Sequence, residues 1–226
     1  MKIQYCSDLH LEFLENKNFI KKNPLKVEGD LLLLAGDIVP FGAMKQSNDF
    51  FDYVSDNYHT TFWLPGNHEY YGYDLSKKIG SLREEIRSNI FLVNNQAIVH
   101  QDVNLIFSTL WSQIKPANEW VIQQSISDFF VIKFGKKKLT APQFNSLHLE
   151  CLSFLTDALQ AKDDRKTIVV THHVPTLMNY PEKYKTDFLN EAFAVELYDF
   201  IETYQPDYWI YGHNHTNTVN CQHNLD

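Results

Sequence analysis

Residues 31–37 read Leu-Leu-Leu-Leu-Ala-Gly-Asp, an apolar run typical of a strand that ends in a carboxylate. Four other short apolar runs also end in side chains that can bind a metal. The five runs are KIQYC before Asp8 and His10, LLLLAG before Asp37, TFWLPG before Asn67 and His68, TIVVT before His172 and His173, and YWIYG before His213 and His215. Because α/β sheets gather their functional groups at the carboxyl ends of their strands, we predict five strands of one such sheet with a site at that edge.

The donor atoms of these side chains indicate which metals they would bind. Oxygen and imidazole donors without a thiolate suit divalent Mn, Fe, Zn, Ni or Co, and disfavour Cu(I) or an iron–sulfur cluster. In an extended segment, residues i and i+2 project to the same side, so Asp8 with His10, and His213 with His215, are each expected to converge on one point. One Asp-x-His triplet arises easily by chance. Five motifs in order, each after a strand-like run, are a specific signal.

As an ordered set, these motifs resemble the calcineurin-like metallophosphoesterase superfamily. The motifs are Asp8-x-His10, Gly36-Asp37, Gly66-Asn67-His68-Glu69, Thr171-His172 and Gly212-His213-x-His215. The resemblance implies a layered α/β/β/α sandwich with a site for two divalent metal ions, of which Mn is favoured. It also implies a hydrolase that cleaves phosphoester bonds by attack of a metal-bound hydroxide.

The resemblance further assigns a role to each motif residue. Asp37 would bridge the two ions, and His68 would contact the substrate phosphate and help the leaving group depart. His172 and His173 stay alternatives for one ligand position; we prefer His172, the first residue after the strand, and His173 would then line the pocket. The remaining ligands would be Asp8, His10 and His215 for one ion, and Asn67, His172 and His213 for the other.

The charge of such a site suits a phosphate ester. Two ions carry +4, Asp8 and Asp37 subtract two and a bridging hydroxide one, which leaves about +1. The site therefore attracts anions although the chain has a net charge of -8. Metal binding lowers the pKa of a bound water from 15.7 towards roughly 7, and an imidazole such as His68 titrates near neutrality, as a general acid should.

The chain departs from parts of the superfamily. After Asp37 it reads Ile38-Val39-Pro40-Phe41-Gly42, where protein serine/threonine phosphatases carry an acidic residue and an arginine that binds phosphate. This difference argues against a protein phosphatase. Glu69 is interpreted in two ways, as a carboxylate that orients His68 or as an exposed loop residue. Relatives usually continue through further strands after the last motif, so we expect a short second sheet or a truncated coding sequence.

Hydrophobic periodicity predicts the secondary structure. Apolar stripes with 3.6-residue spacing predict helices over 75–86, 145–161 and 193–204. Segment 90–108 is expected to form two or three strands of the second sheet, and segment 111–135 is irregular and rich in aromatic residues. Strands are predicted near 2–6, 30–35, 60–64, 103–108, 166–171 and 207–211.

Composition indicates an enzyme in the cytoplasm. A length of 226 residues suits one α/β domain over 1–226. Three cysteines, odd in number and far apart, predict reduced thiols. The chain enters its first strand without a leader, and its apolar runs are too short to cross a bilayer.

We expect a small substrate, a phosphomonoester, phosphodiester or nucleotide, recognised by loops 70–74, 111–130 and 176–187. The acidic composition argues against long nucleic acid, although the metal site alone could cleave short strands or cyclic nucleotides. Lys136–Lys138 is interpreted as a solvated turn. A nuclease and a scaffold without activity are the alternatives, but scaffold relatives usually lose motif histidines and this chain keeps them. Candidate substrate contacts are His173, Tyr70, Trp120 and Tyr180.

Overall fold

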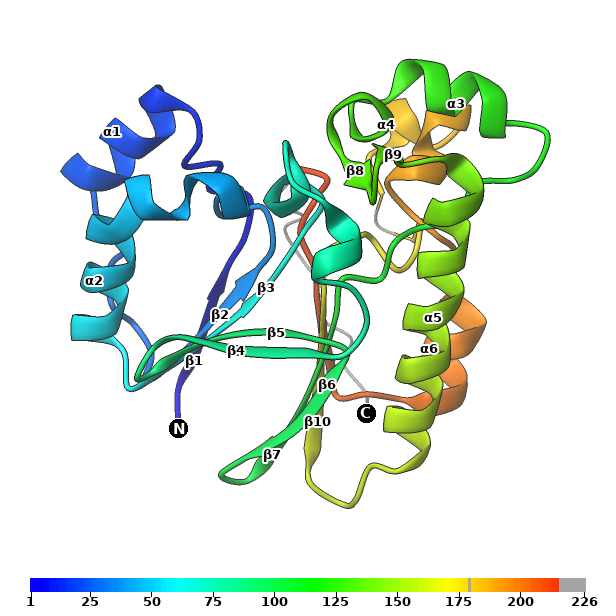
Figure 1. Ribbon diagram of the computed structural model, residues 1–226. Helices are drawn as coiled ribbons and strands as arrows, with labels where there is room; N and C mark the ends of the chain where they lie inside the picture. The colour runs from blue at the N-terminus through cyan, green and yellow to red at the C-terminus, as the bar shows by residue number, and fades with distance from the viewer. Residues whose placement is uncertain (179, 216–226) are drawn as a thin grey trace.

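Two β-sheets pack face to face, and helices cover the outer face of each (Figure 1). A computed structural model describes residues 1–178 and 180–215, without the side chain of Lys183. The first sheet has five strands, in chain order β1 (Ile3–Cys6), β2 (Leu31–Ala35), β3 (Thr60–Leu64), β4 (Leu82–Arg87) and β5 (Ile90–Asn94). The second has four, β6 (Gln96–His100), β7 (Val103–Ser108), β10 (Lys166–Thr171) and β11 (Tyr208–Ile210). The predicted layered sandwich is confirmed.

Helices form the two outer layers. Helices α1 (Leu14–Lys22) and α2 (Asn48–Asn57) lie outside the first sheet, and α5 (Ala141–Gln160) and α6 (Tyr198–Tyr204) lie outside the second (Figure 1). Near one end of α5 lie α3 (Glu119–Ser125), α4 (Asp128–Val131) and a hairpin of β8 (Lys133–Phe134) and β9 (Lys137–Lys138). Short 3-10 helices span Phe41–Ser47, His68–Tyr70, Leu75–Lys77, Glu182–Tyr184 and Phe188–Ala192. Across the described part of the chain, every helix falls short of the length or the hydrophobicity that crossing a membrane requires.

Strand β2 is buried on both faces. Leu31 and Leu33 pack between the two sheets together with Phe107 of β7. Leu32 belongs to another core that includes Phe51 of α2. Because both faces are covered, all residues of β2 are buried, and each buried leucine contributes about 1.5–3 kcal/mol. The buried strand therefore gives a fixed anchor to the loop that carries Asp37.

The five strands that precede the motifs belong to two sheets, so the prediction of one sheet is wrong. Strands β1, β2 and β3 are parallel neighbours in the first sheet. Strands β10 and β11 are parallel neighbours in the second. An apolar run specifies that a strand is buried but does not specify which strand lies beside it. The order of strands in each sheet is β1-β2-β3-β5-β4 and β11-β10-β7-β6.

The helix predicted over 75–86 is also wrong. A 3-10 turn covers Leu75–Lys77, and residues Leu82–Arg87 form β4, which pairs antiparallel with β5. Gly80 lies between them at φ 69°, a left-handed conformation that ends a helix. The hairpin with β5 satisfies backbone groups that a helix would otherwise have paired internally.

Other predictions are confirmed or corrected in part. The six predicted strands and the helix over 145–161 are present as β1, β2, β3, β7, β10, β11 and α5. In segment 90–108, β6 and β7 enter the second sheet, but β5 pairs with β3 in the first. The helix predicted over 193–204 begins only at Tyr198, because Ala194 forms a β-bridge with Val174.

Two smaller predictions concern exposed or reactive side chains. The basic run Lys136–Lys138 is exposed in the β8–β9 hairpin, as expected for a solvated turn. Cys6 and Cys151 are free thiols, and Cys221 lies outside the described residues.

Candidate metal centre

The loops after β1, β2 and β11 turn sharply before they present their side chains. Asp8 and Asp37 have φ of 58° and 56°, and His213 has φ of 72°. His10 and His215 are left-handed as well, at 46° and 48°. Each such residue costs roughly 1–2 kcal/mol, and strain of this kind concentrates at functional sites. Asp8 and His10 converge in one ligand group as predicted, through left-handed backbone and not through strand alternation. His213 and His215 belong to different groups, so the prediction that they converge on one point is wrong.

Two glycines allow the loops of both sheets to approach. A Cβ atom on Gly36, which has φ of 90°, would lie 2.2 Å from Nδ1 of His172. A Cβ atom on Gly66 would lie 2.3 Å from Oδ1 of Asp37 and 2.6 Å from Nε2 of His172. Any larger residue at either position would push apart the side chains that the strands bring together.

One group of side chains gathers on the exposed side of Asp37. The ligand atoms of Asp8, His10, Asp37 and His215 all lie within 4.8 Å of one another. Nε2 of His10 lies 3.1 Å from Nε2 of His215 and 3.8 Å from Oδ2 of Asp37, and Nε2 of His215 lies 3.4 Å from Oδ1 of Asp8. Since the His215 side chain is 61% exposed, this group faces solvent.

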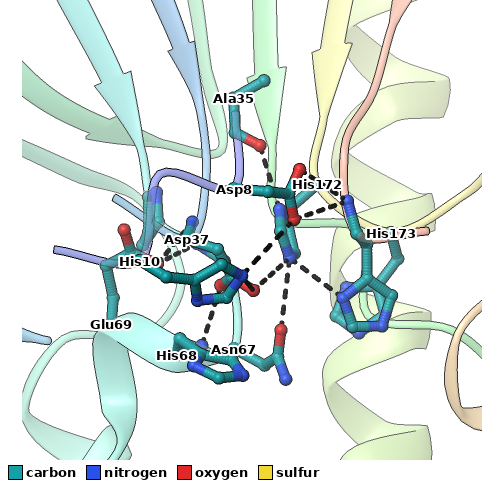
Figure 2. A network of polar contacts seen from close by, with 12 residues as sticks. Asp8, His10, Ala35, Asp37, Asn67, His68, Glu69, His172 and His173 are labelled. Carbon is teal, nitrogen blue, oxygen red and sulfur yellow. Dashed lines mark hydrogen bonds and ion pairs between the residues drawn. The ribbon is translucent and has the colours of Figure 1, made fainter. Parts of the chain in front are cut away.

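A second group gathers on the buried side and shares Asp37 with the first. Nε2 of His172 lies 3.3 Å from Oδ2 of Asp37, 3.1 Å from Nδ1 of His213 and 3.2 Å from Oδ1 of Asn67. Figure 2 shows the His172 ring between the carbonyl of Ala35 and the side chain of Asn67. All four side chains are buried.

Outer hydrogen bonds fix which atoms face the centre of this second group. Nδ1 of His172 lies 2.9 Å from the carbonyl oxygen of Ala35, which can only accept, so in the neutral ring Nε2 carries a lone pair. Nδ2 of Asn67 donates to Oδ1 of the buried Asp128 at 2.9 Å, which turns Oδ1 of Asn67 inwards. Lone pairs of a carboxylate, an amide and an imidazole therefore face one another, an arrangement that a cation would stabilise.

The pKa shifts agree with a site that attracts positive charge. Burial alone would lower the pKa of His172, but the charge of Asp37 outweighs burial and raises that pKa to about 10. Burial, and then the charges of His173 and His172, holds the pKa of His213 well below its usual value. Nε2 of His213 is buried without a hydrogen-bond partner among the described residues. Oxygen and imidazole donors around this orphaned atom fit divalent ions.

His68 lies at the rim of the first group and is held by its neighbours. Its ring centroid is 4.4 Å from that of His10, and the ring stacks on Tyr71 at 4.0 Å. Nδ1 of His68 lies 2.8 Å from Oε1 of Glu12. Burial would lower the pKa of His68, but the Glu12 hydrogen bond and the charge of Asp37 raise it overall.

The sequence model of the calcineurin-like phosphoesterase family covers residues 1–217, which include both ligand groups. The chain belongs to this family. It is thus a metal-dependent phosphoester hydrolase in general type, and its His and Asp clusters fit the dinuclear divalent site that the family implies.

Two comparisons place this phosphoesterase among known proteins. It is 32% identical over 243 residues to an uncharacterized protein of Acanthamoeba polyphaga mimivirus, covering 94% of this chain and 84% of that protein. Its fold is similar to that of the phosphopantetheinyl hydrolase from Mycobacterium tuberculosis, with a TM-score of 0.69 and 15% identity over 98% of this chain and 86% of that one.

Of the four predicted substrate contacts, three are buried and one is exposed. His173 is buried behind the ligand groups, where Nδ1 faces the carbonyl oxygen of Thr109 at 3.3 Å and the ring packs against Trp111. Tyr70 is 1% exposed and its hydroxyl donates to the carbonyl oxygen of Lys78. The structure does not bring these residues into either ligand group.

The other two predicted contacts differ in exposure. Tyr180 is 6% exposed and packs with Val174 and Ala194. Trp120 is 76% exposed on α3. Neither makes a polar or ring contact with the ligand groups in the part of the chain that the structure describes. Of the two, Trp120 alone presents its side chain to solvent.

Three carboxylates hold the site in place; sequence reasoning misassigned the first, Glu69, and missed the other two. Glu69 fits neither interpretation: it is fully buried and accepts hydrogen bonds from the backbone N–H groups of Asp37, Ile38 and Gly66. It therefore joins the loops after β2 and β3. The other two are Glu12 and Asp128. The pattern Asp-x-His-x-Glu over residues 8–12 was a local signal for Glu12, but no local signal singles out Asp128.

The phosphoesterase should be less stable without divalent ions. Ions that bind only the folded chain stabilise it by about 2.7 kcal/mol at a hundred times their Kd, or roughly 5 to 11 °C in melting temperature for a chain of this size. We expect this loss after chelation and its recovery on adding Mn²⁺, measured by calorimetry. Identical melting curves with and without ions would contradict the assignment of a metal centre.

Proposed function

We propose that the chain hydrolyses phosphoester bonds of a small substrate with two divalent ions. The observation that carries this proposal is that two groups of ligand atoms share Asp37. Asp8, His10 and His215 would complete the shell of one ion. Asn67, His172 and His213 would complete that of the other, which leaves His173 as a packing residue behind His213.

The ions and the chain have separate tasks. When bound, the ions supply a hydroxide nucleophile near neutral pH and positive charge for the phosphoryl oxygens. Asp37 holds the two positions together, and the outer hydrogen bonds of Asn67 and His172 keep their lone pairs directed inwards. His68 lies beside the exposed group, so it would protonate the departing oxygen. Mn²⁺ is the first ion to assay, because oxygen and imidazole donors suit it.

Several features favour a small substrate over a polymer. The chain has a net charge of -8, and its concentrated basic run lies in the β8–β9 hairpin. Segment 38–42 lacks the arginine that binds phosphate in protein phosphatases. A scaffold role is less well supported. The chain has every ligand residue that the family pattern requires, and their side chains lie close together in two groups.

The test is a substrate panel with each divalent ion. The panel contains p-nitrophenyl mono- and diesters, nucleotides, cyclic nucleotides, a phosphopantetheinyl ester, duplex DNA and a phosphoprotein. We expect turnover of at least one small ester and lower rates on the two macromolecules. Faster exonuclease action on duplex DNA would support a nuclease instead, and metal binding without any turnover would support a scaffold.

Trp120 is the exposed residue among the predicted substrate contacts, so its substitution tests loop recognition with the least disturbance of packing. Loss of one apolar contact costs roughly 1–3 kcal/mol, so Trp120→Ala should change the ratio of kcat/KM between two small esters by about 10-fold or more with normal metal content. Tyr180→Ala is a poorer probe because the side chain is buried and its loss would disturb packing. The matched control is Tyr208→Ala, an exposed aromatic residue at the amino end of β11. Unchanged ratios in Trp120→Ala would exclude this side chain from recognition.

A further inference from the structure

A carboxylate outside both ligand sets contacts the ring of His68. Oε1 of Glu12 lies 2.8 Å from Nδ1 of His68 and 3.2 Å from Nδ1 of His10. We propose that Glu12 is the positioning residue for His68: it keeps a proton on Nδ1, so that Nε2 exchanges a proton with the leaving group. This inference rests on the proposed function of His68.

Two contacts together fix the His68 ring. Its stacking on Tyr71, with planes 22° apart, sets the plane of the ring. Tyr71 is itself anchored, because its hydroxyl donates to Oδ1 of Asp128 at 2.8 Å. Stacking still allows the ring to turn within its plane or to flip. The directional hydrogen bond to Glu12 removes that freedom and distinguishes Nδ1 from Nε2.

The other carboxylate near His68 in sequence cannot take this role. Glu69 is occupied by three backbone N–H groups and by Nε1 of Trp63, which donates at 3.1 Å. Glu12 is part-buried, with a side-chain exposure of 19%, and lies in the loop between β1 and α1. Among the described residues it is the carboxylate that bonds the His68 ring.

The chemistry of a carboxylate dictates what its neighbours must be. An ionised carboxylate can only accept, so both imidazoles that contact Oε1 of Glu12 present an Nδ1–H group. Nε2 of His10 is the atom that faces Asp8 and Asp37. Oε2 of Glu12 is buried and has no hydrogen-bond partner among the described residues, so the bond to His68 depends on Oε1. A separation of 2.8 Å is a hydrogen-bond length.

The first experiment measures the proton position without using activity. The zinc-loaded full chain, labelled with ¹⁵N at its 10 histidines, is studied by long-range ¹H–¹⁵N NMR, and His68 is assigned by the signal lost in His68→Ala. At a pH at which the His68 ring is neutral, we expect an Nδ1–H tautomer in the natural chain and in the control Glu15→Gln, whose side chain is exposed on α1. In Glu12→Leu the proton should move to Nε2 or exchange between both nitrogens. An unchanged tautomer in Glu12→Leu would overturn the proposal.

The second experiment is a double-mutant cycle at saturating metal. Substituting a residue that orients a functional side chain typically costs 10- to 100-fold in activity, so Glu12→Gln should lower kcat for an alkyl phosphate ester by about that factor, with KM nearly constant. The loss should be smaller for p-nitrophenyl esters, whose leaving group needs less protonation. In the His68→Ala background, Glu12→Gln should have no further effect, because residues that act as one unit are not additive.

Three results would overturn the proposal. The first is that Glu12→Gln lowers kcat by the same factor in the natural chain and in His68→Ala. The second is that Glu12→Gln loses a bound ion. The third is that Glu12→Gln slows esters with good and poor leaving groups equally. The NMR measurement and the double-mutant cycle together also distinguish failure of this inference from failure of the proposed function. If the natural chain hydrolyses no ester, the proposed function is wrong, while the NMR result still decides what Glu12 does to the His68 ring.

Discussion

Asp37→Asn should lose bound metal and most of its turnover. The reason is that Asp37 belongs to both ligand groups, is 1% exposed and has its N–H held by Glu69. Burial would raise the pKa of Asp37, but the neighbouring histidines lower it overall, His172 first, so the carboxylate is ionised. An amide has no negative charge to share between two cations. Since the ions are worth several kcal/mol of charge stabilisation, we expect kcat/KM to fall by roughly 10²- to 10⁴-fold.

The measurement is metal content by mass spectrometry together with the rate on the best small ester. Asp49→Asn is the matched control, because Asp49 is an exposed carboxylate on α2 near Lys21. Both variants should give normal circular dichroism. If Asp37→Asn binds two ions and turns over at the natural rate, Asp37 does not bridge a dinuclear centre.

His68→Ala should have the opposite pattern, with metal retained and turnover lost. Asn67 directs its side chain towards His172, whereas His68 contacts Glu12 and Tyr71 outside the second group. General acid catalysis contributes typically 10²- to 10⁴-fold, so kcat should fall by about that factor for alkyl esters. The loss should be smaller for p-nitrophenyl esters, because p-nitrophenolate departs readily without a proton.

The control for this variant is His59→Ala, since His59 is an exposed histidine just before β3. It should retain the natural rate on every ester. Loss of a metal ion from His68→Ala would show that His68 is a ligand. Equal slowing of p-nitrophenyl and alkyl esters would remove the general-acid role while leaving a role in phosphate binding.

Local pattern was sufficient for the six predicted strands that the structure confirms. Strand β2 was predictable because a short continuous apolar run between polar segments is typical of a strand covered on both faces. It was insufficient for residues 75–86, where a helical stripe became a 3-10 turn and β4. There the pairing of β4 with β5, which depends on a partner strand, overrode the local periodicity.

The ligand types were also readable from sequence, because each follows a strand and offers an oxygen or an imidazole. The backbone conformations of these residues could not be predicted from the sequence. Asp8, Asp37 and His213 adopt left-handed backbones that their own sequences disfavour, and they do so because contacts from other loops hold them there. The N–H of His213, for example, donates to the carboxylate of Asp8, 205 residues away.

By itself, then, the sequence determined the motif-bearing strands, the chemical class of the donors and the family. The tertiary structure alone decided that the strands divide between two sheets, that Asp37 belongs to both ligand groups, and which carboxylates hold His68 and Asn67. Glu12 and Asp128 lie 56 and 61 residues from the side chains they bind. The partner in a hydrogen bond at such separation cannot be read from the local sequence, because the bond forms only after two packed sheets have brought distant loops to the same edge.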